Sequence, residues 1–371
     1  MRVDFVITEL FVGGAERCLT ELAIGLADAG DEVRVFSIGS LPTGEQRLLV
    51  ERLEQRGIAL TSANVDRWTG TLRAFRKLKQ WFAESPPDIC QSFLYHANVI
   101  GAWAAKSAGV PIRVGGVRVA ESNRIRCALE RVAVRQMDSV ICVSDGVRRF
   151  AHRELHATDN QLAVIPNGVD VHRFSAARPA DWTTLEWPAD SIVALFVGRL
   201  HPQKGIERIQ SHIDSIVPPN TKRRLLIVGD GPLQQEIDDW ADAVGAERVR
   251  RIGWQADVGP LMKGCRLLLL PSHYEGMPNV ALEAMAAGRP VVCSRVEGVE
   301  ELLKHRLKEQ TFASEDVGAM KNLIETFLLD EVWSEQIGTE NCERVTREFS
   351  VEAMIDAYRA HYRELLIRTG G

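Results

Sequence analysis

The sequence lacks the features that several protein classes require. It has no run of about 18 apolar residues, the length that a membrane-spanning helix needs. The apolar start VDFVITELFV is interrupted by Asp4 and Glu9, so it predicts a buried strand and not a signal peptide. The seven cysteines are odd in number and never form C-x-x-C, which argues against a disulfide framework and a zinc site. We therefore expect a cytoplasmic protein, with peripheral association at the inner face of a membrane considered below.

An excess of positive charge is also absent. The chain carries 45 Lys and Arg against 50 Asp and Glu, a net charge of −5. A general nucleic-acid-binding protein would be expected to be basic. We therefore expect no nucleic acid among its partners.

The motifs of several enzyme classes are missing as well. The chain has no G-x-S-x-G and no G-x-x-x-x-G-K-[ST], which removes the main support for an elbow-type hydrolase and for a P-loop. His, Cys, Asp and Glu do not cluster at metal-ligand spacing, so we expect no metal and no cofactor. The glycine-rich segment TELFVGGAER is not G-x-G-x-x-G, which disfavours a nicotinamide-dependent oxidoreductase.

The pattern that is present predicts an α/β protein. With 371 residues and about 150 residues per domain as a prior, two domains are expected. Short apolar runs alternate with helical patterns, which is typical of βαβ units and parallel sheets. Strands are expected at 3–7, 32–38, 88–93, 112–117, 139–144 and 162–166, and again at 193–198, 224–229, 248–253, 265–271 and 289–294. Two doubly wound, Rossmann-like domains follow from this repetition.

The domain boundaries can be placed from composition. We expect an N-terminal domain over residues 1–175 and a C-terminal domain over residues 176–350. A last helix, within residues 351–371, follows no new strand and is expected to pack back on the first domain. The segment 173–191 is rich in Pro, Asp and Trp and is predicted to be the linker.

Ligands of open parallel sheets bind beyond the carboxyl ends of the strands, so loops that follow strands are the candidates. In the first such loop, Gly13 and Gly14 precede a helix whose N-terminus would suit an anion, although a tight turn explains them equally well. In VGRLHPQKGIERI, Arg199 and Lys204 directly follow a buried strand. Two fixed cations there would neutralise a diphosphate, and a solvated surface pair is the alternative. The VGDGPL segment is interpreted as a structural turn into the next helix.

The segment PSHYEGMPNVALEAMAAGRPVV is the richest in the chain. It places Glu275 in an irregular loop and Glu283 just inside a short helix. The amides of Asn279 and Val280 would face a phosphate, while Glu283 would accept hydrogen bonds from ribose hydroxyls. Glu275 would contact the hydroxyls of a sugar. A helix-surface role for Glu283 and a turn role for Glu275 are the alternatives, but the segment as a whole favours a binding site.

Taken in order, these segments resemble the retaining, nucleotide-sugar-dependent glycosyltransferases of group 1, or family 4, which have the GT-B fold. The resemblance spans nearly the whole chain. Its carrying pieces are GGAER, SFLYHAN, VSDGVRR, VIPNGVDVHRF, VGRLHPQKGIERI, IVGDGPL, IGW and PSHYEGMPNVALEAMAAGRPVV. The last contains the E-x7-E pattern of the family as Glu275 and Glu283. The resemblance implies two domains facing across a cleft, with the sugar donor mainly on the C-terminal one and the acceptor on the N-terminal one.

The resemblance also implies roles for individual residues. Arg199 and Lys204 would hold the pyrophosphate of the sugar donor, Glu275 would contact the transferred sugar, and Glu283 would hold the ribose. His96, in YHAN, would lie near the sugar and the acceptor. Catalysis is thereby assigned to Glu275, His96, Arg199 and Lys204. The further donor-binding positions, with Gly253 and Trp254 beside the base, are Gly14, Gly253, Trp254, Gly276, Pro278, Asn279 and Val280.

The implied reaction transfers a hexose from a UDP- or GDP-sugar to a hydroxyl of a glycan or lipid-linked acceptor, with retained configuration and without a metal. Envelope polysaccharide or glycolipid synthesis is the expected setting. A sugar-nucleotide epimerase or hydrolase of the same fold, a non-catalytic sugar-binding module and an NAD-dependent oxidoreductase are the alternatives. The sequence departs from the family over 294–316, where a helix-like HRLKEQ replaces a glycine-containing turn.

Basic residues are concentrated in the first half. Residues 67–153 contain 15 Lys and Arg against 6 Asp and Glu, a net charge of +9. The segment TLRAFRKLKQWF predicts a basic amphipathic helix that would rest on an anionic membrane through residues 72–82. An ordinary domain helix with a solvated basic face is the alternative. The arginines expected to meet a lipid-linked or phosphate-bearing acceptor are Arg113, Arg118, Arg124, Arg126, Arg131 and Arg135.

Overall fold

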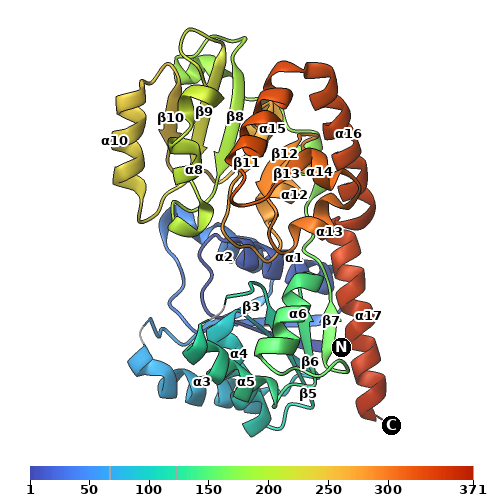
Figure 1. Ribbon diagram of the computed structural model, residues 1–371. Helices are drawn as coiled ribbons and strands as arrows, with labels where there is room; N and C mark the ends of the chain where they lie inside the picture. Colours follow the sequence, from blue (N-terminus) through green and yellow to red (C-terminus); the bar gives the residue numbers. More distant parts are fainter. Residues whose placement is uncertain (67, 122, 371) are drawn as a thin grey trace. The chain divides into compact units, whose positions relative to one another are not determined.

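The computed structural model describes residues 1–66, 68–121 and 123–370, which form two compact units (Figure 1). Unit 1 comprises residues 1–168 together with the chain from Val351 onward, and unit 2 comprises Val169–Ser350. Each unit is built on its own sheet, in which the paired strands run parallel. The predicted α/β class with two parallel sheets is confirmed.

Unit 1 contains a seven-stranded sheet with the order β3-β2-β1-β4-β5-β6-β7. The strands are β1 (Arg2–Ile7), β2 (Glu32–Ser37), β3 (Ala59–Ser62), β4 (Ile89–Phe93), β5 (Ile112–Val117), β6 (Ser139–Cys142) and β7 (Leu162–Val164). Strand β1 lies at the centre, where Val3 pairs with Val33 on one side and with Ile89 on the other. Strand β3 was not among the expected strands. It is a four-residue edge strand without a fully buried residue, so its apolar signal is weak.

Helices cover both faces of this sheet. On one face lie α1 (Gly14–Asp28), α2 (Leu48–Gln55) and α17 (Val351–Gly370), and on the other lie α3 (Thr71–Glu84) and α4 (Tyr95–Ser107). The buried stripe of α1 includes Leu19, Leu22 and Leu26, whose helical spacing points them into one core. The red helix α17 runs along unit 1 in Figure 1, and its Tyr358 and Tyr362 are fully packed in that core.

The structure corrects the interpretation of residues 72–82 as a membrane-resting helix. Its apolar residues Ala74, Leu78 and Phe82 are buried in the core of unit 1, and the ring of Trp81 packs against Phe36. Because these side chains fill the domain interior, they are not available to a lipid surface. The exposed residues of α3 are Leu72 and Ala83, four basic residues, Gln80 and Glu84.

Unit 2 contains a six-stranded sheet with the order β10-β9-β8-β11-β12-β13. Its strands are β8 (Ile192–Val197), β9 (Arg223–Val228), β10 (Val249–Ile252), β11 (Leu267–Leu270), β12 (Val291–Ser294) and β13 (Thr311–Phe312). Strand β13 has two residues and was not expected, because a pair of residues carries no periodic signal. The predicted helical character of HRLKEQ is confirmed, since α14 (Leu307–Gln310) leads directly into β13.

The helices of unit 2 again form two layers. One core is made by the sheet with α8 (Glu207–Gln210), α9 (Ile213–Ile216), α10 (Gln234–Val244) and α15 (Val317–Leu329). The short buried helix α12 (Asn279–Ala286) contacts β11, β12, α7 (Val171–Ser175) and α16 (Glu331–Glu348).

The segment 173–191 is not the linker that its composition suggested. It belongs to unit 2, where Trp182 and Trp187 are buried with their ring centroids 6.4 Å apart. Ala180 also donates a backbone hydrogen bond to the Pro260 carbonyl. Pro, Asp and small residues mark this stretch as irregular, but its two tryptophans give it an apolar anchor.

Both sheets reverse their strand order beside the first strand of the unit. In unit 1 the reversal lies between β1 and β4, and in unit 2 between β8 and β11. Open α/β sheets bind ligands at the carboxyl ends of the strands at such a point. The topology therefore selects two loops in each unit, the ones that follow these strands.

Candidate functional site

The two selected loops of unit 2 are joined by an ion pair. Lys204 follows β8, Glu275 follows β11, and Lys204 Nζ lies 2.7 Å from Glu275 Oε1. Ser272 Oγ also donates to Glu275 Oε1, at 2.8 Å. The Glu275 residue is only 7% exposed. A buried carboxylate that is both paired and hydrogen-bonded is fixed in position, which suits it to orient a polar ligand.

Close backbone packing holds these loops together. Gly205 has φ +65°, and a Cβ at this residue would lie 2.0 Å from the Pro271 carbonyl oxygen. Gln203 Nε2 donates to the Tyr274 carbonyl at 3.0 Å, and the His273 amide donates to the Gln203 carbonyl at 2.8 Å. Only glycine tolerates both the left-handed conformation and the contact at residue 205. The close approach of Gly205 to Pro271 therefore helps to place Lys204 beside Glu275.

Arg199 lies in the same loop as Lys204, but its side chain is not part of an ion pair among the described residues. Its side chain is exposed, and within the described part of the chain no hydrogen bond or ion pair engages its guanidinium. The loop beneath it is tight, because a Cβ at Gly229 would lie 2.1 Å from the Gly198 carbonyl oxygen. The arrangement presents one uncommitted cation and one paired cation at the same sheet edge, which fits an anionic ligand with several oxygens.

The start of α12 provides the next part of this site. Pro278 is its N-cap residue, and Asn279 and Val280 form its first turn. Glu283 lies four residues after Asn279, so both project from the same side of the helix. The backbone of the preceding Gly276 packs closely against Gly298. A Cβ at Gly298 would lie 2.0 Å from the Gly276 carbonyl oxygen.

Gly253 and Trp254 lie farther along the sheet edge, after β10. Strand β10 is two strands away from β8. The Trp254 amide donates to Asp230 Oδ2 at 3.0 Å, and Arg251 forms an ion pair with the same carboxylate at 3.2 Å. Asp230, in VGDGPL, thus anchors the loop that was expected to border a base. The sequence interpretation of VGDGPL as a plain turn did not include this role.

The loop after β1 in unit 1 contains a buried glutamate that sequence reasoning missed. Gly13 is the extended N-cap of α1 and Gly14 is the exposed first residue of the helix. A Cβ at Gly13 would lie 2.3 Å from Glu16 Oε2, so the carboxyl group lies directly beneath this glycine. Burial raises the pKa of Glu16 to about 7, although its own backbone amide opposes the shift. The available signal was the acidic residue at the third helical position of GGAER.

His96 lies in the first turn of α4, after the second selected strand of unit 1. It is half-buried, and its ring meets Tyr95 edge-on with centroids 5.0 Å apart. Burial, and then the charge of Arg126, lower the pKa of His96, so its imidazole is neutral near pH 7. Leu94, which caps this helix, has φ 71° and ψ 160°, a region normally reserved for glycine. The strained corner fixes the direction in which α4 leaves the sheet.

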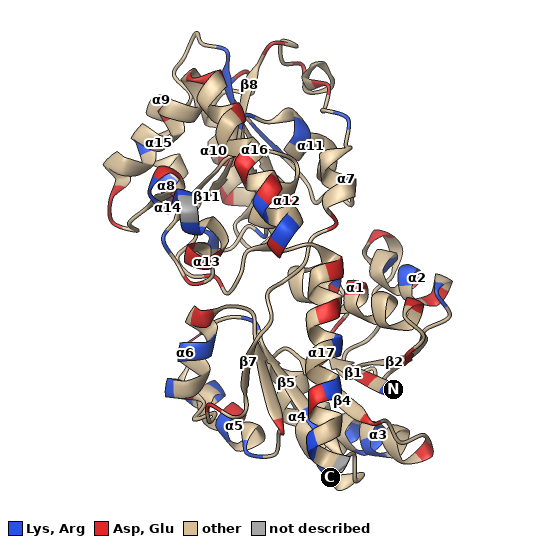
Figure 2. Ribbon diagram, turned by 90° about the vertical axis from the view of Figure 1, so that its right-hand side faces the viewer, with Lys and Arg blue, Asp and Glu red and all other residues tan. Residues whose placement is uncertain are grey.

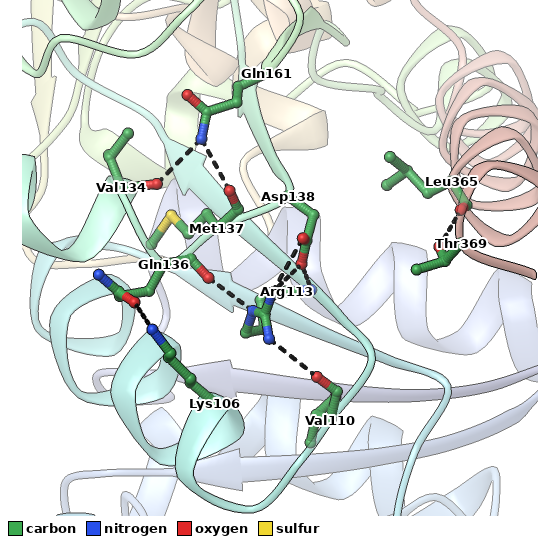
Figure 3. A network of polar contacts seen from close by, with 10 residues as sticks. All are labelled: Lys106, Val110, Arg113, Val134, Gln136, Met137, Asp138, Gln161, Leu365 and Thr369. Atoms are coloured by element: carbon green, nitrogen blue, oxygen red, sulfur yellow. Dashed lines mark hydrogen bonds and ion pairs between the residues drawn. The ribbon is translucent and has the colours of Figure 1, made fainter.

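Two of the six arginines expected to meet an acceptor are structural, which corrects that expectation. Arg118 is buried, donates to Asn167 Oδ1 and lies over the Phe93 ring at 5.3 Å. Figure 3 shows Arg113 donating to the Gln136 carbonyl at 2.7 Å and paired with Asp138. Their guanidinium donors serve the fold, because buried donors need partners.

The other four arginines lie around α5 (Arg124–Val134). Arg126 pairs with Glu121 and lies over the Tyr95 ring at 4.6 Å. Arg131 donates to the Glu154 carbonyl at 2.9 Å. Arg124 and Arg135 are exposed. The arginines of residues 113–135 therefore divide into structural and surface groups.

The described residues contain neither a cluster of metal ligands nor a helix suited to span a membrane. No group of three or more His, Cys, Asp or Glu side chains within this part of the chain is arranged to hold a metal ion. Across the same residues, no helix combines the length and the apolar character that spanning a membrane requires.

Family models match both halves of the chain. Residues 12–173 match the model described as Glycosyltransferase Family 4, and residues 180–346 match the one described as Glycosyl transferases group 1.

Individual proteins are also similar to this chain. It is 27% identical over 298 residues to the UDP-Gal:alpha-D-GlcNAc-diphosphoundecaprenol alpha-1,3-galactosyltransferase of Escherichia coli, covering 76% of each chain. It is 25% identical over 349 residues to the lipopolysaccharide core biosynthesis glycosyltransferase LpsE of Rhizobium meliloti (strain 1021), covering 93% of this chain and 94% of that one. Anabaena Alr3699/HepE, solved with UDP-glucose, superposes with a TM-score of 0.83 at 23% identity, covering 98% of this chain and 100% of that chain. The last likeness concerns the fold, which is GT-B.

Proposed function

Because this chain belongs to the group 1 and family 4 glycosyltransferases, we propose that it transfers a hexose from a nucleoside diphosphate sugar, with retained anomeric configuration. The chain is a glycosyltransferase of polysaccharide, lipopolysaccharide or glycolipid synthesis. The sugar donor, the stereochemical course and the acceptor are the parts that we add.

The joined loops of unit 2 carry this proposal. The paired Lys204, the uncommitted Arg199 and the first turn of α12 lie on the loops selected by the strand reversal. A diphosphate has two charged groups, and two cations together with helix amides match it. When the sugar leaves, negative charge grows on this diphosphate. Donors already in place would stabilise that charge without reorganisation, which is the usual source of rate enhancement.

We assign the two glutamates of this site to different parts of the sugar donor. Glu275, fixed by Lys204 and Ser272, would accept hydrogen bonds from hydroxyls of the transferred sugar. Glu283, one helical turn into α12, would bind the ribose. Gly276 and Pro278 would let the backbone pass close to the diphosphate, and no metal is assigned to the site.

We favour UDP over GDP as the nucleotide of the sugar donor. The E. coli relative is named for UDP-Gal, and Anabaena HepE was solved with UDP-glucose. The loop of Gly253 and Trp254, anchored by Asp230, would border the uracil.

The acceptor side of the reaction is assigned to unit 1. We propose a hydroxyl of a glycan or lipid-linked acceptor, by analogy with the diphosphoundecaprenol acceptor in the name of the E. coli relative. His96, neutral near pH 7, would accept a hydrogen bond from the sugar or the acceptor, and Gly14 would approach the diphosphate. In this scheme the acceptor proton passes to an oxygen of the leaving phosphate, so no protein group is needed as the base.

The test is nucleotide release from UDP-, GDP- and ADP-sugars in the presence of a lipid or oligosaccharide extract. Wild type is compared with Glu275→Gln and Lys204→Met, and with Lys222→Met as a control, because Lys222 pairs with Asp190 at the protein surface. We expect release from a UDP-hexose that requires the extract and is lost in the first two variants alone. Release without any acceptor would instead indicate a hydrolase or epimerase. Binding of a nicotinamide cofactor without binding of any sugar nucleotide would overturn the proposal.

A further inference from the structure

The outward side of α5 carries an exposed apolar ridge. Ile125, Leu129 and Val132 are 76%, 44% and 44% exposed. Their spacing of four and three residues aligns them along one side of the helix. The opposite side holds Cys127, Ala133 and Val134, which are buried. The helix therefore has a second apolar face, in addition to the one that packs into its domain.

Positive charge exceeds negative charge around this ridge, because the nearby carboxylates of Glu121 and Glu154 are paired with Arg126 and Arg153. Arg124 and Arg135 are exposed at its two ends, and neither has a hydrogen-bond or ion-pair partner among the described residues. The acidic residue of α5, Glu130, is buried and accepts a hydrogen bond from Asn98 Nδ2 at 2.8 Å. No carboxylate of the helix itself therefore opposes the arginines. Figure 2 shows Lys and Arg on α5 and on the neighbouring α6 (Asp145–Glu154).

A cavity of about 340 Å³ opens beside the ridge. Its lining residues are Asn123, Arg124, Cys127, Ala128, Arg131 and Glu154. The lining has two guanidinium groups and an amide, and its one carboxylate, Glu154, is paired with Arg153. This composition suits the phosphate of a lipid headgroup whose acyl chains lie over the ridge.

The scaffold behind α5 is rigid. Figure 3 shows Gln161 Nε2 donating to the Val134 and Met137 carbonyls, at 3.2 and 2.8 Å, at the end of this helix. Lys106 of α4 contacts Gln136 in the same network. These hydrogen bonds anchor the C-terminal end of α5 to its domain. An anchored helix loses little conformational entropy when it binds a surface.

From this placement we propose that the outward face of α5 is the surface by which unit 1 docks on a bilayer that contains anionic lipids. Apolar side chains flanked by arginines are the composition that inserts at a headgroup boundary and is attracted to negative lipids. The inference rests on the proposed function for its purpose, because a transferase with a lipid-linked acceptor works at a bilayer. It also replaces α3, whose apolar side is buried, with an element whose apolar side is exposed.

Flotation of the full chain with vesicles tests the surface. One set of vesicles is phosphatidylcholine alone, and the other has one part phosphatidylglycerol to two parts phosphatidylcholine. Ile125→Ser with Leu129→Ser removes the ridge, and Leu329→Ser with Val332→Ser is the matched control, since these residues of unit 2 are 64% and 77% exposed. We expect wild type to float with the anionic vesicles only. The ridge variant should lose binding by roughly tenfold or more, and the control should bind like wild type.

A second pair of variants separates α5 from α3. Arg124→Gln and Arg135→Gln should each weaken binding about fivefold. Arg73→Gln and Arg76→Gln, exposed on α3, should change it less. Failure of wild type to float, or a larger loss with the α3 variants, would overturn the proposal. So would a dimer in light scattering that the ridge variant dissociates, because a second copy would then cover the ridge.

The vesicle experiment and the nucleotide-release experiment test the two proposals independently. Nucleotide release with a water-soluble acceptor should be unchanged in the ridge variant, whose fold is checked by circular dichroism. Loss of flotation with intact release leaves the transferase in place and tests only the surface. If no sugar donor is used, flotation still decides whether α5 binds bilayers.

Discussion

The two units share a strand order and a reversal point, yet they treat a buried glutamate in opposite ways. Glu16 of unit 1 and Glu275 of unit 2 follow a strand at the reversal, and they are 8% and 7% exposed. Glu275 has Lys204 Nζ at 2.7 Å and the Ser272 hydroxyl at 2.8 Å. Glu16 has no ion pair within the described residues, and burial raises its pKa to about 7.

The difference lies in where each glutamate finds its partner. The cation of Glu275 comes from the loop of a different strand, brought near by the contact of Gly205 with Pro271. Glu16 lies under Gly13, three residues away in sequence, in the first turn of α1. A topological position therefore does not determine the partner of a buried carboxyl group. The two glutamates are similarly buried, and only Glu275 receives a cation from a neighbouring loop.

Among these predictions, loss of the Lys204–Glu275 ion pair in unit 2 should change activity the most. Lys204→Met should lower kcat/KM for nucleotide release by roughly 10²–10³, the cost of one donor to a developing anion. Lys222→Met, which removes a surface cation of the same unit, should leave the rate within about twofold. Steady-state kinetics with a UDP-hexose measures both. Equal effects of the two substitutions would mean that the pair is ordinary surface charge.

A glycine substitution in each unit separates backbone conformation from contact. Gly205 and Gly44 have φ +65° and +60°, but a Cβ meets Pro271 only in the first case and nothing within 4 Å in the second. Gly44→Ala should cost about 1–2 kcal/mol. Gly205→Ala should cost roughly 1–3 kcal/mol more, because the methyl group displaces the loop. Urea unfolding measures the difference, and UDP affinity should fall in Gly205→Ala alone.

The stability contribution of Glu16 should depend on pH. Folded Glu16 keeps its proton up to a pKa of about 7, against 4.5 when unfolded, so its contribution is complete below 4.5 and lost as pH rises through 7. Glu16→Gln should match wild type at acid pH and exceed it by up to about 3 kcal/mol in alkali. Glu275→Gln should instead be less stable than wild type at neutral pH, since Lys204 loses its partner. Unfolding midpoints across this pH range test both, and the comparison fails if both variants shift in the same direction.

The smallest effect compares two buried hydroxyls. Ser272 Oγ donates to the Glu275 carboxylate, whereas Thr20 Oγ1 donates to the Glu16 carbonyl, both at 2.8 Å. Ser272→Ala should cost about 2 kcal/mol because its acceptor is charged, and Thr20→Val about 1 kcal/mol because its acceptor is neutral. Calorimetric unfolding gives both values. A larger cost for Thr20→Val would contradict a strong hydrogen bond between Ser272 and Glu275.

Much of the fold was predictable from local patterns. Strongly apolar strands and helices with a buried stripe, such as α1, gave both domains and their class. The errors have physical reasons as well. Strand β3 is an exposed edge, β13 has two residues, and the segment 173–191 is anchored by two tryptophans that composition counted as linker. Helix α3 shows the limit of an amphipathic pattern. The same pattern is compatible with a helix on a membrane and with a helix packed on a domain core, and α3 is the second.

The candidate site divides in the same way. Arg199, Lys204, Glu275 and Glu283 were found from loop composition and family motifs, and the family and GT-B fold that these motifs implied are confirmed. Their roles toward a ligand stay predictions. Glu16 and Asp230 were missed because their importance lies in burial and in a contact with another loop. Arg113 and Arg118 were expected to meet an acceptor, but their guanidinium groups bond within unit 1.

Local patterns along the chain were enough to predict the α/β class, the two parallel sheets and the loops in which a binding site should lie. These follow from periodicity and turn chemistry, which act between residues close in the chain. Long-range packing was needed to show that Lys204 pairs with Glu275, that Glu16 is buried without an ion pair among the described residues, and that α5 and not α3 exposes an apolar face. Burial and ion pairing depend on which distant segments pack together, and no local pattern specifies that packing.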